Sequence, residues 1–292
     1  MEFAAYLPPQ LLSHLQRVLG REHTLVAASG WSELDHLVRR SPVDVAVLDP
    51  GADGVVRADH LVEVVRRYPS LPIVIYTVLT PQSLRAVVEL SNHGLQQVVL
   101  HRFDDEPRRF LETLEQQPGV SLSEALLDRL AAPLVTLPTT LVRAIERMYR
   151  RPRGFGDASD LAREAGMPRR TLYRVLEQAG FAHPSIMVRG ARLLRAYAYL
   201  RDPGHLVDDV ATKLGYSNQQ RFAKHVRETF GVTPLTLRRT ISAEECVARI
   251  AATLYPQAGV LHLDAGSRGD RAVDVPGADD LDEPSDLDRE PA

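Results

Sequence analysis

Residues 214–234 read LGYSNQQRFAKHVRETFGVTP, and this stretch predicts a helix that begins just after a glycine turn. Phe222, Val226 and Phe230 recur at i, i+4 and i+8, so they form one apolar stripe along that helix. The polar side chains that fall away from the stripe are Gln219, Gln220, Arg221 and Lys224. An apolar stripe is typical of any helix that packs on a core, so the function of the polar face has to come from other observations.

The first such observation is a repeat at a period of 49 residues, because DLAREAGM (160–167) matches DVATKLGY (209–216). In each copy a short helix is expected to end at a glycine, whose missing Cβ permits a left-handed turn. A second helix follows, RRTLYRVLEQAG (169–180) in the first copy and QQRFAKHVRETFG (219–231) in the second, where the turn is one residue longer. The pattern predicts two helix-turn-helix units. The matched pairs are Asp160 with Asp209, Leu161 with Val210, Ala162 with Ala211 and Gly166 with Gly215.

The charge distribution favours a polyanionic partner for the same segment. The chain has 292 residues and a formal net charge of -3. Residues 139–240 hold 9 acidic and 19 basic side chains, a net charge of +10. Residues 1–138 hold 17 acidic and 12 basic side chains (-5), and residues 241–292 hold 12 acidic and 4 basic ones (-8). A basic segment between acidic neighbours is typical of a nucleic-acid-binding domain, the alternative being an arginine-rich surface that serves only solubility.

With these residues in view, the stretch from about 138 to 240 resembles the DNA-binding domain of the AraC/XylS family of bacterial transcription regulators. The resemblance is carried by 162–166, by 192–200 in a long linking helix, and by the LGY, Phe222 and GVTP of the opening stretch. It implies that two recognition helices, joined by that long helix, enter neighbouring turns of the major groove of double-stranded DNA. Pro168 departs from the serine that is usual in the family and is expected as the first residue of its helix.

The resemblance also implies which side chains contact bases. Glutamine and arginine offer paired hydrogen bonds that match adenine and guanine edges, and recognition helices read bases chiefly through their first residues. In the linking helix, Arg189, Arg192 and Arg195 are expected to cap, pair or contact phosphate instead of reading bases. The expected base-contacting residues are Arg170, Tyr173 and Arg174 in the first unit and Gln219, Gln220, Arg221 and Lys224 in the second.

The N-terminal 118 residues have a different pattern, in which β-branched apolar runs alternate with amphipathic helical stretches. This alternation predicts an α/β doubly wound parallel sheet. The expected strands lie at 3–7, 23–29, 43–50, 71–77 and 96–100.

This domain is similar to the receiver domain of two-component response regulators. Asp49, Thr77 and His101 follow successive expected strands, at the positions of the phosphate-accepting aspartate, the Ser/Thr and the lysine of that family. However, YLPPQLL (6–12) contains no acid where a receiver binds Mg²⁺, and His101 replaces the lysine. Phosphoryl transfer to Asp49 would therefore lack most of its charge stabilisation. We predict a receiver-like domain that is not phosphorylated in the ordinary way; Asp49 is the candidate phosphoacceptor, and capping of the following loop is its favoured alternative role.

These patterns divide the chain into five segments. We expect a receiver-like α/β domain at 1–118, a linker helix region at 119–137, and an all-α double helix-turn-helix domain at 138–241. A C-terminal helix extension is expected at 242–263. The last segment, 264–292, is acidic, rich in Gly and Pro and nearly free of large apolar residues, so it is expected to be a disordered tail.

Several classes of function are not favoured by the sequence. It has no GxSxG, P-loop, HExxH or Cys/His cluster and a single cysteine, Cys246, so we expect no enzyme activity, metal site or cofactor. The absence of an 18-residue apolar run and of a basic leader indicates a cytoplasmic protein with no membrane partner. A homodimer through the receiver-like domain, at 80–94 and 104–117, is suggested only by analogy.

The leading interpretation is a sequence-specific, DNA-binding transcription regulator that works independently of phosphorylation. One alternative is a response regulator switched by phosphorylation of Asp49. Another is an interaction adaptor that keeps the helix-turn-helix fold without binding DNA, although the arginines and glutamines on both predicted recognition helices argue against it.

Overall fold

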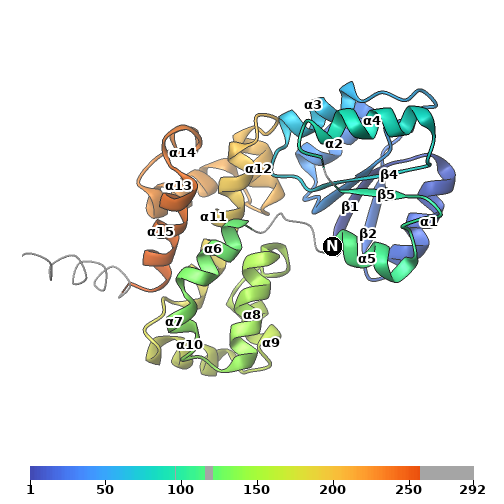
Figure 1. The fold of residues 1–292 in the computed structure, drawn as a ribbon. Helices are drawn as coiled ribbons and strands as arrows, with labels where there is room; N and C mark the ends of the chain where they lie inside the picture. The colour runs from blue at the N-terminus through green and yellow to red at the C-terminus, as the bar shows by residue number, and fades with distance from the viewer. Residues whose placement is uncertain (96, 116–120, 257–292) are drawn as a thin grey trace, which may run out of the picture.

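A computed structural model describes residues 1–95, 97–115 and 121–256, which form an α/β domain and a helical domain (Figure 1). The predicted tail at 264–292 and the end of the predicted extension at 257–263 lie outside the described residues. Among the described helices, none combines the length and the apolar character that a membrane span requires.

The N-terminal domain is a five-stranded sheet in the order β2-β1-β3-β4-β5, with parallel pairing throughout. This order is that of flavodoxin-like doubly wound folds, so the predicted fold class is confirmed. The strands are β1 (Glu2–Tyr6), β2 (Thr24–Ala27), β3 (Val45–Leu48), β4 (Ile73–Thr77) and β5 (Val98–Leu100). The helices are α1 (Pro9–Leu19), α2 (Trp31–Arg40), α3 (Asp59–Arg67), α4 (Pro81–Ser91) and α5 (Pro107–Glu115).

Side chains of β1, β3 and β4 alternate between two buried layers, which explains why successive residues in these strands are mostly apolar. In β1, Phe3 and Ala5 pack in the layer formed with α1 and α5. Ala4 and Tyr6 pack in the opposite layer, formed with α2, α3 and α4. Because each helix runs back across the sheet, α2 and α3 end at the edge where the strands begin, whereas Asp49 follows the other end of β3.

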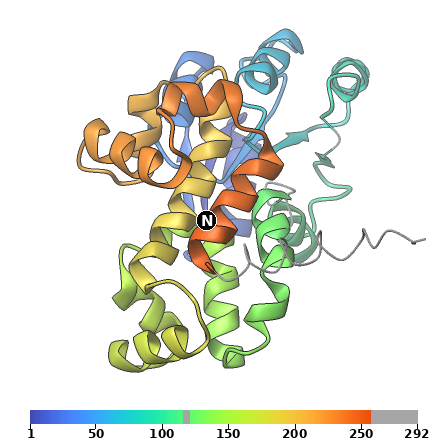
Figure 2. The same cartoon turned by 90° about the vertical axis from the view of Figure 1, so that its left-hand side faces the viewer.

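The C-terminal domain is all-helical, as predicted. The long helix α11, drawn in yellow, connects a lower unit with an upper, orange unit (Figure 2). Its elements are α6 (Ser121–Arg129), α7 (Ala131–Leu134), α8 (Thr139–Arg150), the 3₁₀ turn η1 (Pro152–Gly154), α9 (Ala158–Glu164), α10 (Arg169–Gln178), α11 (Pro184–Arg201), α12 (Val207–Lys213), α13 (Gln219–Phe230), α14 (Pro234–Thr240) and α15 (Ala243–Leu254).

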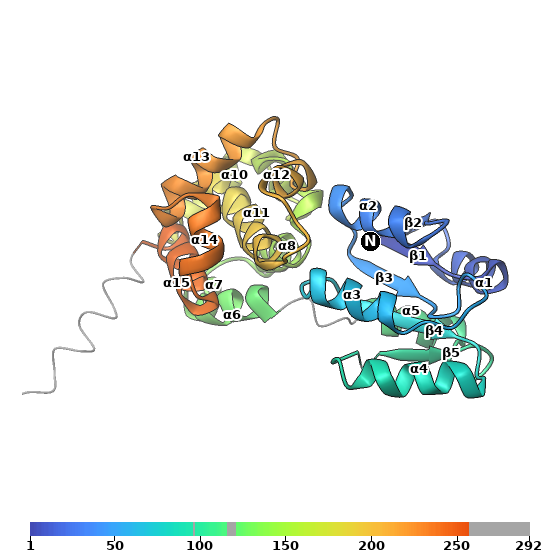
Figure 3. The ribbon, with the colours of Figure 1, turned by 90° about the horizontal axis from the view of Figure 1, so that it is seen from above.

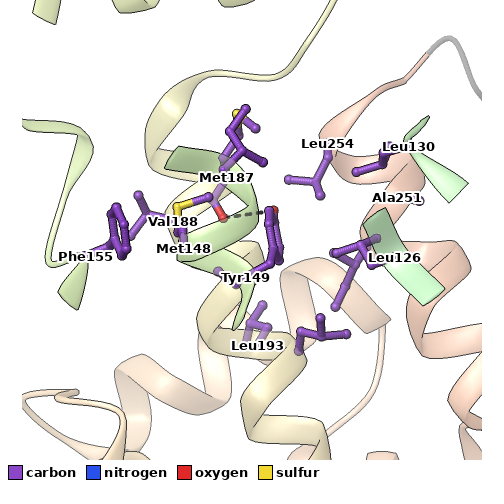
Figure 4. Close-up of a cluster of buried hydrophobic side chains, with 14 of the residues drawn as sticks. Leu126, Leu130, Met148, Tyr149, Phe155, Met187, Val188, Leu193, Ala251 and Leu254 are labelled. Atoms are coloured by element: carbon purple, nitrogen blue, oxygen red, sulfur yellow. Dashed lines mark hydrogen bonds between the residues drawn. The ribbon is translucent and has the colours of Figure 1, made fainter. Parts of the chain in front are cut away.

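One hydrophobic core extends through this whole helical domain and includes the region that the sequence suggested as a linker. Leu126 of α6 and Leu130, which directly follows that helix, lie in the same buried cluster as Tyr149 of α8 and Leu254 of α15 (Figure 4). The Tyr149 hydroxyl lies within this cluster and donates to the Met187 carbonyl oxygen at 3.2 Å. The residues at 119–137 that the structure describes therefore help to bury the helices on which the helix-turn-helix units are built.

The two domains meet where α2 and α3 end, with α12 and α2 on facing sides (Figure 3). Gly204, in the loop after α11, donates its backbone N–H to the Arg67 carbonyl at 2.9 Å. A Cβ on Gly204 would lie 2.3 Å from Cε1 of Tyr68, a side chain that is fully buried. Tyr68 is in turn held by a 2.6 Å hydrogen bond to Asp35. Only glycine fits this approach of the two backbones.

Charged groups from the helical domain complete this contact. Asp202 accepts hydrogen bonds from the backbone N–H of Ser70 at 3.0 Å and from its hydroxyl. Asp209, 1% exposed, lies 3.2 Å from a guanidinium nitrogen of Arg39 and 3.3 Å from Nε of Arg40. Both arginines end α2, where cations also interact favourably with the helix dipole.

Lys213 is buried in the same contact. Its Nζ donates to the Val38 carbonyl at 2.8 Å and to Nε2 of His205 at 2.9 Å. Since an ammonium group only donates, Nε2 of His205 is the acceptor, which leaves its Nδ1 facing Asp202 at 3.4 Å. These buried polar groups come from segments far apart in the chain, and they fix how the receiver-like domain sits on α11 and α12.

Candidate nucleic-acid interface

Two helix-turn-helix units are present where the repeat predicts them, α9–α10 and α12–α13. The glycines of the two turns, Gly166 and Gly215, have φ values of +67° and +72°. L-residues with a Cβ pay a steric cost in this left-handed region, so glycine is favoured at both positions. The second turn is one residue longer, since four residues separate α9 from α10 and five separate α12 from α13.

The aspartates of the repeat have the same structural role in both units. Asp160 is the third residue of α9, and its carboxylate accepts from the backbone N–H of Asp157 at 3.2 Å. Asp209 is the third residue of α12 and accepts from the backbone N–H of Leu206 at 3.0 Å. Each carboxylate thus satisfies a backbone donor that the helix itself leaves free. Asp209 differs in that it also binds the two arginines of the receiver-like domain.

The second recognition helix, α13, is anchored on its apolar stripe and exposed on its polar face. Phe222, Val226 and Phe230 are each 0% exposed, as the sequence predicts. The side chain of Asn218 caps the helix by accepting from the Arg221 N–H at 2.8 Å. The helix ends at Gly231, which has φ +70°. The predicted base-contacting residues Gln219, Gln220, Arg221 and Lys224 are all exposed.

These four side chains differ in how freely they can move. Lys224 forms an i,i+4 ion pair with Glu228 at 3.9 Å, and Glu228 also accepts from Arg189 of α11 at 2.7 Å. Gln219, Gln220 and Arg221 lie in the first turn, where a helix end can approach base edges. The first turn is therefore the part of α13 best placed to read bases.

The first recognition helix, α10, presents Arg170 and Arg174 as exposed side chains. Tyr173 is half-buried instead: its ring lies edge-on to His183, with centroids 4.5 Å apart, and its hydroxyl accepts from Arg169 at 2.9 Å. It is thus more constrained than the outward-facing residue that the sequence suggested. Pro168 precedes the helix as its capping residue and is not its first residue, a shift of one position from the prediction.

The arginines of α11 pair or bond as the sequence suggested. Arg189 pairs with Glu228, and Arg192 donates to the carbonyls of Phe155 and Gly156 at 3.1 and 2.8 Å. The guanidinium of Arg195 lies over the ring of Tyr199, 5.0 Å from its centroid. In the described part of the chain, none of the seven predicted base-contacting residues has a hydrogen bond or ion pair with the receiver-like domain.

The opposite edge of the sheet holds the residues that correspond to a receiver site. Asp49 and Thr77 come together as predicted, with the Thr77 hydroxyl donating to Oδ1 of Asp49 at 3.1 Å. The same oxygen accepts from the Gly51 N–H at 2.8 Å, so Asp49 caps the loop that follows β3. Burial raises the pKa of Asp49, although the bonds from Gly51 and Thr77 oppose that shift.

His101, the third residue of this comparison, bonds elsewhere. Its Nδ1 lies 2.6 Å from Oδ2 of Asp105 and 2.8 Å from the Tyr76 hydroxyl. His14 of α1 approaches the same carboxylate at 3.6 Å. Potential metal-ligand atoms of His14, His101 and Asp105 lie within 4.8 Å of one another, and hydrogen bonds already link this group. The side chain of His101 therefore belongs to a hydrogen-bonded cluster with Tyr76, Asp105 and His14.

Comparison with known proteins supports the helical half of this description. Residues 161–240 match a family model described as a helix-turn-helix domain. The segment is an AraC-type helix-turn-helix domain, which confirms the prediction over these residues. No curated protein matches the chain significantly.

Two solved structures show distant similarity, each at 16% sequence identity. One is full-length FixJ from B. japonicum. The match includes 80% of this chain and 98% of the FixJ chain, with a TM-score of 0.36. The other is the RcsB response regulator of Salmonella typhimurium. The match includes 61% of this chain and 89% of the RcsB chain, with a TM-score of 0.30. The feature that makes residues 1–115 receiver-like is the strand order β2-β1-β3-β4-β5 with parallel pairing throughout.

The helix-turn-helix match and the geometry of the two units define the class of protein. The chain is a DNA-binding transcription regulator with a receiver-like N-terminal domain and an AraC-type helix-turn-helix domain. The side chains that join these two domains, Asp202, His205, Asp209 and Lys213, were not recognised from the sequence. One feature of the sequence could have pointed to this contact. Lys213 is one of only two lysines in a chain whose helical domain is rich in arginine.

Proposed function

We propose that this protein recognises a specific DNA sequence by placing α10 and α13 in neighbouring major-groove turns. The observation that carries the proposal is the pair of equivalent units, each with an anchored apolar face and exposed arginine or glutamine at the start of its second helix. The proposed base contacts are Arg170, Tyr173, Arg174, Gln219, Gln220, Arg221 and Lys224. The net charge of +10 on residues 139–240 supports the accompanying contacts to phosphates.

The test begins with selection of bound duplexes from a random DNA library by the full chain. Replacing Gln220 and Arg221 by alanine should weaken binding to the selected duplex by about 1 to 3 kcal/mol for each base that is no longer read. Their side chains are exposed, so the fold should be unchanged by circular dichroism. Arg108→Ala, on α5 of the receiver-like domain, is the matched control and should leave affinity unchanged.

Two outcomes would contradict the proposal. Equal affinity of the folded double variant and the parent for the selected duplex would remove α13 from base recognition. The absence of a gel shift with any duplex at low salt would favour the alternative of an adaptor that does not bind DNA. A steep loss of affinity with rising salt is expected if phosphates are contacted.

We further propose that DNA binding does not depend on phosphorylation of Asp49. The first sheet-to-helix loop contains Leu7 and Pro8 where a receiver supplies acids for Mg²⁺. Asp49 is occupied as a loop cap, and His101 is bonded to Asp105. These observations support a site without ligands for Mg²⁺ and without a free lysine. Such a site lacks the positive charges that stabilise a transferred phosphoryl group.

Intact mass spectrometry tests this point directly. After incubation with Mg²⁺ and acetyl phosphate, the mass of the chain should remain unchanged. A stoichiometric gain of one phosphoryl group that disappears in Asp49→Asn would instead make Asp49 a phosphoacceptor, as the alternative of a phosphorylation-operated regulator requires.

We also propose that a second copy of this chain covers the exposed face of α4. Leu84 and Val88, at i and i+4, are 53% and 58% exposed. Arg85 and Glu89 are exposed beside them, also at i and i+4. In a two-fold arrangement Arg85 of one copy can meet Glu89 of the other, so the face is complementary to itself. A dimer of this chain formed through α4 would present two helical domains to DNA.

Analytical ultracentrifugation distinguishes the outcomes. The parent should sediment as a dimer, and Leu84→Glu should sediment as a monomer with unchanged circular dichroism. Val55→Glu changes a residue of similar exposure outside α4 and should remain dimeric. A parent that is monomeric across the concentration range would exclude the dimer.

A further inference from the structure

A cavity of about 860 Å³ lies between the two domains, on the helical-domain side of the edge where the strands begin. The receiver-like domain contributes residues next to β1 and β2 and the end of α2. The helical domain contributes the end of α8, the turn η1, one side of α11 and the end of α12. The volume falls within the range of small-molecule sites, which often lie between domains.

The lining carries an excess of positive charge. Eight arginine or lysine side chains face the cavity, against four glutamate or aspartate side chains. Arg40, Arg147 and Arg153 are already paired with carboxylates. Within residues 1–95, 97–115 and 121–256, Arg150, Arg151 and Arg195 have no carboxylate oxygen within 4.0 Å of their guanidinium nitrogens. The acidic side chains therefore leave several cations of the cavity unpaired.

The deepest of these cations are held close together. Arg195 and Lys213 approach the same ring of Tyr199, at 5.0 and 4.0 Å from its centroid. Lys213 is 6% exposed, and its ammonium group bonds only to neutral acceptors. Burial, followed by the charge of Arg195, lowers the pKa of Lys213 to about 7. The carboxylates of Asp202, Asp209 and Asp44 oppose this shift, and an anion bound beside Lys213 would favour its charged form in the same way.

The charge and shape together select a class of ligand. Planar guanidinium groups bind phosphate oxygens in pairs, and several unpaired arginines in one cavity suit more than one phosphoryl group. The receiver-like domain forms one wall, so the space suits a small molecule better than the continuous backbone of a duplex. We propose that this cavity binds a small molecule that carries two or more phosphoryl groups.

Such a ligand would bridge the domains next to the turn that leads into α13. The lining includes Leu214 and Gly215, which directly follow α12. Occupancy of the cavity would therefore act on the position of the second recognition helix. This inference goes beyond the proposed recognition of DNA and does not depend on it.

The test is isothermal titration of the full chain with inorganic pyrophosphate at pH 7, with ionic strength held constant by sodium chloride. Pyrophosphate should bind saturably at one site per chain and at least tenfold more tightly than sulfate. A parallel titration with ATP separates a site that needs only the phosphates from one that also accepts a nucleoside. Tighter binding of either phosphate compound than of sulfate supports the proposal.

Variants locate the site. Arg150→Gln combined with Arg151→Gln should lower the association constant for pyrophosphate at least tenfold, and Arg195→Gln should do the same. Arg143→Gln, exposed on the same helix α8 but outside the cavity lining, should have no effect. Arg150 and Arg151 are exposed, so their double variant keeps the test valid even if Arg195→Gln fails to fold.

Three results would overturn the proposal. The first is the absence of saturable heat with both pyrophosphate and ATP. The second is equal weakening by Arg143→Gln, which would mean that net charge alone attracts the anion. The third is loss of pyrophosphate binding in Gln220→Ala/Arg221→Ala with no loss in the cavity variants, which would place the anion at the recognition helix. Because these titrations contain no DNA, their result is independent of whether the protein reads a DNA sequence.

Discussion

The contact of Asp209 with the receiver-like domain can be measured because the repeat supplies an internal control. Asp160 and Asp209 cap their helices in the same way, but Asp160 pairs with the exposed Arg163 of its own helix, whereas Asp209 pairs with Arg39 and Arg40 of the receiver-like domain. Replacement by asparagine keeps an oxygen for the cap in both cases. In Asp209→Asn, the amide oxygen can keep the place of Oδ2, which accepts from Leu206 and Arg39. The amide donor would then face the guanidinium of Arg40, which is also a donor, and the negative charge opposite both arginines would be lost.

The expected cost follows from the geometry. Hydrogen bonds to charged groups contribute about 1.5 to 3 kcal/mol each when buried. Here the distances are 3.2 to 3.3 Å and the arginine side chains are 30% and 49% exposed, so both can regain water. We therefore expect Asp209→Asn to lower the free energy of unfolding by about 2 kcal/mol and Asp160→Asn by about 0.5 kcal/mol. A double-mutant cycle with Arg39→Gln should give a coupling energy of about 1 kcal/mol.

Urea unfolding provides the measurement. Trp31, the single tryptophan, lies at the start of α2 and reports on the receiver-like domain, while far-UV circular dichroism is dominated by the helical domain. Equal losses in Asp209→Asn and Asp160→Asn, or a coupling energy with Arg39 near zero, would show that the ion pairs between the domains add nothing to stability.

Three further predictions concern single residues. Gly215→Ala should lower the free energy of unfolding in urea by about 1 to 2 kcal/mol, because φ is +72° at this position. Gly30→Ala is the control and should cost little, because the backbone of Gly30 is extended; at both positions an added Cβ would meet no atom within 4 Å. Burial raises the pKa of Cys246 to about 12, so the native thiol should resist iodoacetamide at pH 8 and react fully in denaturant; rapid native alkylation would contradict its burial. Because the pKa of Lys213 is lowered to about 7, the unfolded chain binds one more proton than the folded chain between pH 7 and the ordinary lysine value, so this group should make stability rise with pH in that window. The rise should be smaller in Lys213→Met, and identical pH profiles for the two proteins would remove Lys213 as its source.

Much of the fold was predictable because the decisive patterns are local. Strand runs in which apolar residues follow one another without alternation indicate a sheet covered on both faces, and the order β2-β1-β3-β4-β5 agrees with that expectation. The matched Gly166 and Gly215 both occupy left-handed turns, as the repeat suggested. The neighbouring positions of Asp49 and Thr77 followed from the rule that parallel strands end at one edge.

The parts that were not predicted depend on side-chain contacts that no sequence pattern shows, either between the two domains or across a loop. Asp209 and Lys213 have the composition of an ordinary solvated helix face, and only their contact with α2 shows why they are buried. Tyr173 was expected to point outward, but its ring packs on His183, ten residues later. His101 was compared with a lysine by position alone, and its bond to Asp105 depends on the turn between them.

The close fit of Gly204 against Tyr68 restricts how this protein can be recombined. A receiver-like domain from another protein could be fused to this helical domain without disturbing the Asp49 edge, which lies away from the junction. Such a chimera would still need a side chain at position 68 that leaves room for the Gly204 backbone, together with partners for Asp202 and Asp209. Residues 39, 68 and 70 would therefore have to be transferred as a set with the loop after α11, and natural substitutions at these positions should occur together.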